Sequence, residues 1–272
     1  MALPLIHRPP TANEVERLRL ILSTFQDGTG MLQLGGDFTL PGWRDFERAT
    51  ALAFKGQAQE SKAIFDVLLP DEEREGIFYG LSCKMRSELN RISRDGRVTI
   101  EVSNSAGQFW KGLQVRGLNQ GNYKNSPGDA GTSLIETVNG WHDVVSTDRG
   151  GAIDIHNSYY LVLSWNKTGD YQLHQFSLIL PDADEITWSF PVLGRGAAPE
   201  TVGRRLAGND GNGNLFEWYG ESGGQLKYYP LAANAVWSSD VFRLEPLGNI
   251  EYGIINKAKA YFPKKWKRVQ ED

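Results

Sequence analysis

The sequence predicts an α/β fold in which helices flank a mixed sheet and further antiparallel strands follow in the C-terminal half. Three observations support this class. Apolar residues recur at helical spacing in several segments of the first half, short apolar or alternating segments bounded by turn residues indicate strands between them, and the second half is mostly of this strand type. The 272 residues, of which 40% are hydrophobic, can bury a sizeable core. Neither an internal repeat nor a linker is evident, so we expect a single domain over residues 1–272.

Two helices are predicted near the N-terminus. Thr11 and Glu14 stand at the spacing of a capping box, and residues 15–25 carry apolar side chains at helical spacing. A Gly-rich stretch, residues 28–36, ends this helix. The second helix is predicted from Trp43 to about Phe54.

Three strands and a third helix are predicted next. Residues 63–69 and 77–85 are mainly apolar and are separated by a charged turn, and residues 97–103 alternate between apolar and polar side chains. Residues 132–145 again carry apolar side chains at helical spacing, which predicts a helix.

Short strands dominate the remainder of the chain. A turn at residues 167–170 predicts a hairpin between the first two of them. The predicted strands are Tyr159–Trp165, Tyr171–Leu180, Ile186–Val192, Leu215–Tyr219 and Gln225–Tyr229.

Composition limits the compartment and the class of partner. Cys83 is the only cysteine, which excludes an internal disulfide and a multi-cysteine zinc site and favours a reducing compartment. No apolar run is long enough to span a bilayer and no signal-peptide pattern is present, so we expect a cytoplasmic protein that does not enter the membrane. The net charge of −4 argues against a protein that coats nucleic acid by charge alone, but it allows a local basic cleft.

One group of residues suggests metal-assisted phosphodiester hydrolysis. Asp66 is a carboxylate inside an apolar strand, where burial is unfavourable unless the group is paired or bound to a metal. Ser82 and Lys84 lie two apart on the next strand, so both can face Asp66 while Cys83 points away. Lysine can orient water and stabilise phosphate charge, and the Cys83 carbonyl can serve as a metal ligand. Glu47, on the second predicted helix, can reach the same metal.

The spacing of these residues resembles that of the PD-(D/E)XK nuclease superfamily, and of type II restriction endonucleases in particular. Asp66 is followed by fifteen residues and then Ser82-Cys83-Lys84, with Glu47 upstream, and the resemblance extends over residues 42–110. It implies a restriction-endonuclease-like αβββαβ core, Mg²⁺-dependent hydrolysis of double-stranded DNA at a specific sequence, and often a homodimer that cuts both strands.

Two positions depart from the family pattern. Phe65 stands where proline is usual, and Ser82 stands where the family usually has Asp or Glu. Some members carry serine there and recruit a carboxylate from elsewhere; the candidates here are Glu47, then Glu88, then Glu101. The resemblance thus implies Mg²⁺ bound by Asp66, Glu47 and the Cys83 carbonyl, and a catalytic set of Asp66, Ser82, Lys84, Glu47 and Glu88.

Under this hypothesis, basic and amide side chains position the duplex and contact its bases. The chain then divides into an N-terminal helical extension (1–40), a catalytic core (41–150) and a β-rich part that completes the fold and contacts DNA (151–272). Lys264–Arg268 is either a phosphate-contacting arm or a solvated tail. The expected DNA-contacting residues are Arg86, Arg91, Arg94, Asn119, Asn122, Lys124, Arg204 and Arg205.

Other functional classes remain as alternatives. A non-catalytic, β-rich module that binds DNA or glycan would be indifferent to Mg²⁺ and to changes at Asp66. A carbohydrate-active enzyme could use Asp182, Asp184 and Glu185, although their position after a proline is more typical of a charged turn. Residues 210–214 match part of a calcium loop but lack its required glycine, and a turn is the better interpretation.

Overall fold

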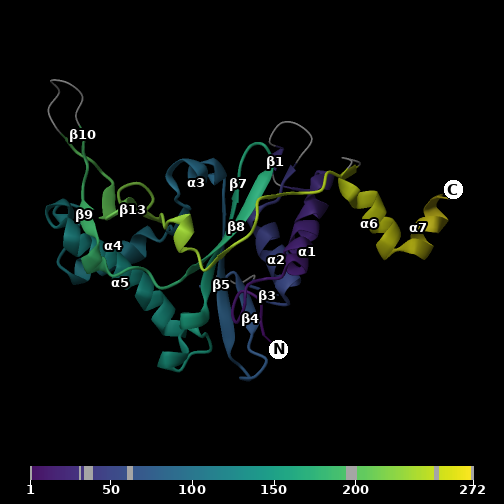
Figure 1. Cartoon of the computed structure of the whole chain (residues 1–272), viewed down its shortest axis with the longest axis horizontal. Coiled ribbons are helices and arrows are strands. Elements are labelled where there is room, and N and C mark those ends of the chain that lie inside the picture. Colours follow the sequence, from purple (N-terminus) through teal and green to yellow (C-terminus); the bar gives the residue numbers. More distant parts are fainter. Residues whose placement is uncertain are drawn as a thin grey trace.

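The computed structural model describes residues 2–30, 32–33, 39–59, 64–193, 201–247 and 251–270. Within these ranges the chain forms seven α-helices, a mixed seven-stranded sheet and an antiparallel five-stranded sheet, which confirms the predicted α/β class. Figure 1 shows α1 and α2 on one side of the strands β5, β7 and β8, and α4 and α5 on the other side. Two short ribbons, β1 (Leu32–Gln33) with β2 (Thr39–Leu40) and β10 (Val192–Leu193) with β11 (Thr201–Val202), complete the strand pairs.

The seven-stranded sheet has the order β15-β8-β7-β5-β4-β3, and β16 also pairs with β8. β5 and β7 are parallel, whereas the other pairs are antiparallel. The connection from β5 to β7 includes the long helix α5 (Pro127–Val145), as a parallel pair requires. The strands are β3 (Gln57–Ala58), β4 (Val67–Pro70), β5 (Phe78–Arg86), β7 (Tyr159–Trp165), β8 (Asp170–Ser177), β15 (Trp237–Ser238) and β16 (Phe242–Arg243).

Helices α1 (Ala12–Ser23) and α2 (Trp43–Phe54) cover one face of this sheet. The predicted capping box is present: the Thr11 side chain accepts from the Glu14 N–H at 3.3 Å, and Glu14 accepts from the Thr11 N–H at 2.8 Å. The predicted bounds of α2 are confirmed. Because α1 packs on α2 and shares its core, residues 12–23 belong to the helical layer of this sheet.

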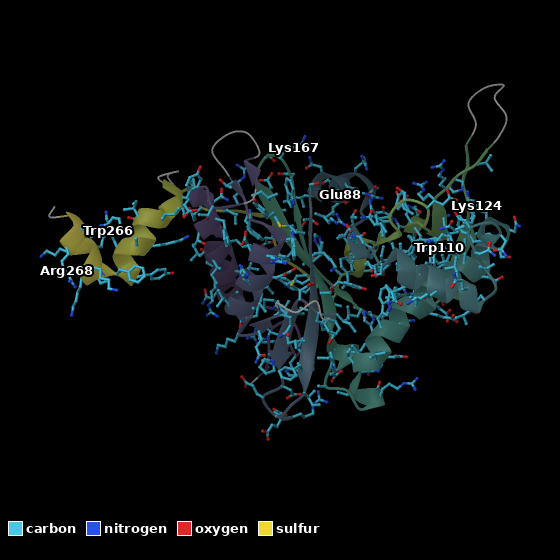
Figure 2. All side chains as sticks on the ribbon, turned by 180° about the vertical axis from the view of Figure 1, so that it is seen from behind. Glu88, Trp110, Lys124, Lys167, Trp266 and Arg268 are labelled. Atoms are coloured by element: carbon cyan, nitrogen blue, oxygen red, sulfur yellow. The ribbon has the colours of Figure 1, made fainter. Side chains whose placement is uncertain are left out.

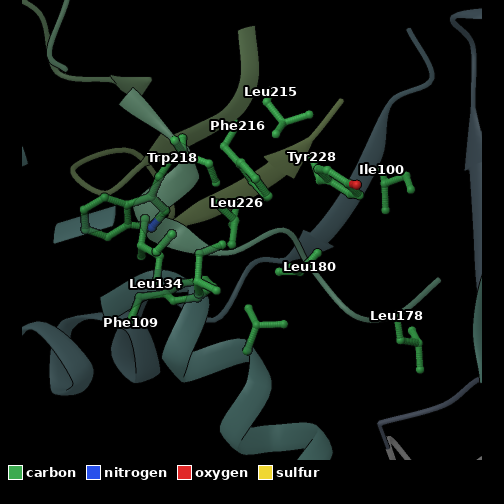
Figure 3. Packing of buried hydrophobic residues seen from close by; sticks show 14 of the residues in the cluster. Ile100, Phe109, Leu134, Leu178, Leu180, Leu215, Phe216, Trp218, Leu226 and Tyr228 are labelled. Atoms are coloured by element: carbon green, nitrogen blue, oxygen red, sulfur yellow. The ribbon is translucent and has the colours of Figure 1, made fainter. Parts of the chain in front are cut away.

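The five-stranded sheet, β6-β14-β13-β12-β9, packs against α4 (Ala106–Val115) and α5. Figure 3 shows the large side chains of this core, with Trp218 and Phe216 from the sheet close to Phe109 and Leu134 from the helices. All four are inaccessible to solvent, so they form a buried core between the second sheet and the helices. The strands are β6 (Ile100–Ser103), β9 (Thr187–Ser189), β12 (Leu206–Asp210), β13 (Gly213–Tyr219) and β14 (Gln225–Tyr228).

The predicted strand at residues 97–103 is present, but it starts later than predicted. β6 begins at Ile100 and pairs with β14 in the second sheet. Arg97 and Val98 are held before it, because the Arg97 guanidinium donates to the Tyr229 carbonyl and the Val98 N–H donates to the Pro230 carbonyl. In the first sheet, β3 pairs with β4 and β4 pairs with β5, so these three strands are consecutive both in the chain and in the sheet.

Several other element bounds also differ from prediction. Helix α3 (Leu89–Asp95), helix α4 and strand β12 were not predicted, and α5 begins at Pro127, earlier than residue 132. Proline is favoured in the first turn of a helix, where its missing N–H has no partner to lose. The predicted strand at residues 63–69 begins at Val67, and residues 60–63 lie outside the described residues.

The predicted turns at residues 167–170 and 210–214 are both hairpin tips, between β7 and β8 and between β12 and β13.

The chain ends in two helices, α6 (Ile254–Tyr261) and α7 (Pro263–Gln270), which extend away from both sheets (Figure 1). The basic segment Lys264–Arg268 lies on α7 and is therefore helical. None of the described helices has the length and the apolar character needed to cross a bilayer.

Candidate active site

An open pocket of about 440 Å³ lies where the end of β5 approaches α2 and β6. It therefore receives side chains from both faces of the first sheet and from the edge of the second. Its chemically relevant lining residues are Trp43, Glu47, Asp66, Cys83, Lys84, Arg86, Glu101 and Asn104.

Asp66 is held at the point where β4 begins. Its backbone N–H donates to the Leu81 carbonyl at 3.0 Å, and its own carbonyl accepts from the Gln59 N–H at 2.9 Å. Val67 is the first residue of β4 and pairs with Leu81 of β5. Asp66 Oδ2 accepts a hydrogen bond from the Cys83 N–H at 2.7 Å, at the end of the β4–β5 pairing. The carboxylate is thus fixed by the backbone of the strand that carries Lys84.

Lys84 lies beside this carboxylate, with Nζ 3.7 Å from Asp66 Oδ2. Both side chains are about three-quarters buried, with 22% and 26% of their surface exposed. The ammonium is therefore close enough to pair with the carboxylate and exposed enough to meet a ligand in the pocket. The predicted proximity of Asp66 and Lys84 is confirmed.

Cys83 points to the opposite face of β5, as predicted, and packs in the core beneath α2. Burial raises the pKa of its thiol, and the negative charges of Asp66 and Glu47 raise that pKa further. Both carboxylates therefore lie close to this residue, although one comes from β4 and the other from α2. A buried thiol with a raised pKa is not a nucleophile.

The backbone of Cys83 offers an oxygen on the Asp66 side of the strand. In a β-strand the N–H and C=O of one residue point to the same edge, and the Cys83 N–H points to Asp66. Asp66, Glu47 and this carbonyl are all oxygen donors in one pocket, and Mg²⁺ is usually bound by one or two carboxylates together with water and phosphate oxygens. Among the described residues no three His, Cys, Asp or Glu side chains are grouped to hold a metal.

Ser82 is not brought into this pocket. It lies on the same face of β5 as Lys84, but it lines a neighbouring pocket together with His142 and Tyr160. The short serine side chain stays in that pocket, whereas the long lysine side chain reaches the edge of the sheet. The structure therefore separates Ser82 from Asp66, unlike the predicted arrangement.

The other two candidate glutamates occupy different places. Glu101, on β6, lines the active-site pocket, where it forms an ion pair with Arg86 and accepts from the Asn104 amide. Glu88 precedes α3 and lines an adjacent pocket with Arg86 and Trp43. Burial lowers the pKa of Arg86, and the Glu88 charge opposes this shift. Glu88 Oε2 is buried and has no hydrogen-bond partner among the described residues.

The predicted DNA-contacting arginines near the pocket have intramolecular partners. Besides the Glu101 pair of Arg86, Arg91 pairs with Asp95 at 2.9 Å and lies over the Tyr229 ring at 4.3 Å. Arg94 is 75% exposed and 3.5 Å from the same Asp95. Of these three, Arg94 is the one presented most fully to solvent.

The second predicted set lies at the far end of the molecule. Figure 2 shows Lys124 near Trp110 at one end and the C-terminal helices at the other, with Glu88 between them. Lys124 and Arg204 both approach Glu221, at 3.0 and 3.5 Å. The Asn119 and Asn122 side chains hold their own loop by accepting from the N–H groups of Gly121 and Asn119.

The outer face of the second sheet carries a row of charged side chains that was not predicted from the sequence. Glu101, Lys227 and Glu217 lie opposite one another on β6, β14 and β13. Glu217 is only 7% exposed and accepts from the hydroxyl groups of Tyr219 and Tyr229, each at 2.7 Å, and from Arg205 at 2.5 Å. The alternation of Phe216, Glu217 and Trp218 could have indicated this row. The two aromatic residues face the core, so the carboxylate between them must lie on the opposite face of the strand.

Comparison of the chain with protein-family models, with curated proteins and with solved structures found no match. The inference of function therefore depends on the geometry of the pocket.

Proposed function

We propose that this protein is a Mg²⁺-dependent endonuclease that hydrolyses double-stranded DNA at a specific sequence, as type II restriction endonucleases do. One observation carries the proposal. The Asp66 carboxylate is fixed on the Cys83 N–H, with the Lys84 ammonium 3.7 Å away and Glu47 in the same pocket. A carboxylate and a backbone carbonyl can hold a metal ion, and an ammonium group beside them can stabilise the charge that develops on a phosphate during hydrolysis.

The order of the elements supports this proposal. α2, β3, β4, β5, α5 and β7 follow one another as αβββαβ, with the additional elements α3, β6 and α4 inserted between β5 and α5. This is the order that the resemblance to PD-(D/E)XK nucleases implies, with Gln57–Ala58 as the first strand. Asp66 lies at the start of the second strand and Lys84 near the end of the third.

Each residue of the pocket then has a distinct role. When bound, Mg²⁺ lowers the pKa of a coordinated water and neutralises charge on the phosphate. Asp66, Glu47 and the Cys83 carbonyl would hold that ion. Lys84 donates to a phosphate oxygen and to the attacking water, and thereby orients the water and stabilises the charge that develops. The Arg86 guanidinium, which also lines the pocket and is paired with Glu101, contacts the DNA backbone.

The wider assignments follow from this function. Symmetric cleavage of both strands suits a homodimer with two-fold symmetry, and we propose this state for the active enzyme in the cytoplasm. Arg94, on α3, is the most exposed of the predicted arginines Arg86, Arg91 and Arg94, and we propose that it contacts the DNA backbone.

The test is incubation of the purified protein with phage and plasmid DNA, methylated and unmethylated, in Mg²⁺ or in EDTA. Discrete fragments that form only with Mg²⁺ are expected. Intact DNA under every condition, with DNA binding that is indifferent to Mg²⁺, would contradict the proposal and favour the non-catalytic binding module.

A further inference from the structure

A second open pocket, of about 260 Å³, adjoins the candidate active site. The two pockets share Val102 and Ser103 of β6 as part of their walls. The second pocket lies between β5, β6, β7 and α5, and its polar and aromatic lining residues are Ser82, Ser103, Ser105, Trp141, His142 and Tyr160.

Three of these polar side chains are more than nine-tenths buried. Ser82, His142 and Tyr160 are 6%, 7% and 2% exposed. The His142 ring and the Tyr160 hydroxyl both line the pocket. A ligand in the pocket can therefore form hydrogen bonds with these groups.

The size and chemistry of the pocket favour a planar heterocycle. Its volume greatly exceeds the roughly 30 Å³ that one water molecule occupies in the liquid. Trp141 and Tyr160 supply aromatic surface, and the His142 ring is itself stacked on Phe65, with centroids 6.1 Å apart and planes at 17°. Burial lowers the pKa of His142 to about 4, so at neutral pH one ring nitrogen donates and the other accepts. A nucleobase, which has aromatic faces and alternating donors and acceptors along its edge, matches this lining.

The position of the pocket relative to Lys84 supports the same ligand. Ser82 and Lys84 are two residues apart on one face of β5, which places them about 7 Å apart along the strand. Lys84 faces the proposed phosphate site, and Ser82 faces the second pocket. A base stacked within a duplex cannot enter a pocket among buried side chains, so the base must first leave the stack.

We propose that this pocket binds one DNA base, turned out of the duplex beside the scissile phosphate. The proposal deepens the nuclease function above and rests on it. It also gives Ser82 a role: the serine does not replace the missing carboxylate but forms a hydrogen bond with the edge of the base.

The test uses the four histidines of the full-length protein as reporters, by NMR of their ring signals. The His142 signal is assigned as the one that disappears in His142→Gln. The protein, in EDTA, is titrated separately with dAMP, dGMP, dCMP and TMP, and with deoxyribose 5-phosphate, which lacks a base. His174 is a matched control, since it is also buried and its pKa is also lowered to about 4, but it lies on β8 and stacks on Phe176.

At least one nucleotide is expected to shift the His142 signal to saturation, while His174 and the sugar phosphate titration show no change. Ser82→Ala is expected to weaken that nucleotide about fivefold, the effect of one neutral hydrogen bond. An unchanged His142 signal with all four nucleotides, or an equal change with the sugar phosphate, would overturn the proposal. DNA cleavage is measured in parallel: cleavage without the His142 shift rejects the base pocket alone, whereas the shift without cleavage rejects the nuclease function alone.

Discussion

Replacing Asp66 by Asn and by Ala separates its role in the fold from its role in the pocket. The side chain does two things: Oδ2 accepts the Cys83 N–H at 2.7 Å, and the carboxylate charge faces Lys84 and the proposed metal site. Asparagine retains an oxygen that can accept the same N–H but removes the charge. Alanine removes both.

The expected magnitudes follow from these contacts. Asp66→Ala leaves the Cys83 N–H without its partner at a buried strand edge, and we expect unfolding to become easier by about 1–3 kcal/mol. Asp66→Asn loses only a partly exposed pair at 3.7 Å, which corresponds to less than about 1 kcal/mol. Both variants lose the anionic metal ligand, and losing about 4 kcal/mol of transition-state stabilisation slows cleavage roughly 10³-fold.

The assay is urea unfolding of the wild type and both variants, combined with single-turnover cleavage of plasmid DNA. We expect the two variants to be equally impaired in cleavage, and Asp66→Ala to be less stable than Asp66→Asn. Asp66→Asn that cleaves DNA at the wild-type rate would refute the assignment of Asp66 as a ligand. Equal stability of the two variants would refute its role at the strand edge.

Three further outcomes are expected. Glu47→Gln should raise the Mg²⁺ concentration needed for half-maximal cleavage about tenfold or more, since one anionic ligand is lost; an unchanged Mg²⁺ dependence would remove Glu47 from the site. Arg97→Ala should lower the free energy of unfolding by about 3 kcal/mol, measured in urea, because it breaks a 2.9 Å pair with Asp210 from a guanidinium that is 5% exposed. Burial alone would raise the pKa of Glu217, but hydrogen bonds from Tyr219 and Tyr229 and the Arg205 charge outweigh it and lower the pKa below 4.5. Its stabilisation is therefore complete above about pH 4.5 and is lost as pH falls through the lowered pKa, so Glu217→Gln should flatten this acid limb of the stability profile; an unchanged acid limb would contradict this.

Local sequence signals were sufficient for elements that have a clear apolar pattern. The bounds of α2 and β7 were predicted correctly, because the first has regular helical spacing and the second is a continuous apolar run between turns. α3 has seven residues with few apolar side chains, and its stability depends on tertiary contacts such as Arg91 on Tyr229. No local pattern indicates such a contact.

The site was predictable in part for the same reason. The proximity of Asp66 and Lys84 follows from two neighbouring strands and a two-residue period. The position of Ser82 did not follow, because a second sheet and α5 form a separate pocket beside it. Glu101 was ranked last of the three candidate glutamates, but pairing of its strand with β14 places it at the pocket, where it forms an ion pair with Arg86.

The most direct test of the central claim compares Lys84→Ala with Lys167→Ala in DNA cleavage with Mg²⁺ and in DNA binding with EDTA. Lys167 is a matched control, because it is an exposed lysine at the tip of the β7–β8 hairpin, outside the pocket lining (Figure 2). We expect the Lys84→Ala variant to bind DNA as the wild type does but not to cleave it. The Lys167→Ala variant is expected to cleave DNA at the wild-type rate. Cleavage by Lys84→Ala at the wild-type rate, or equal loss of activity in both variants, would contradict the assignment of this pocket as the nuclease centre.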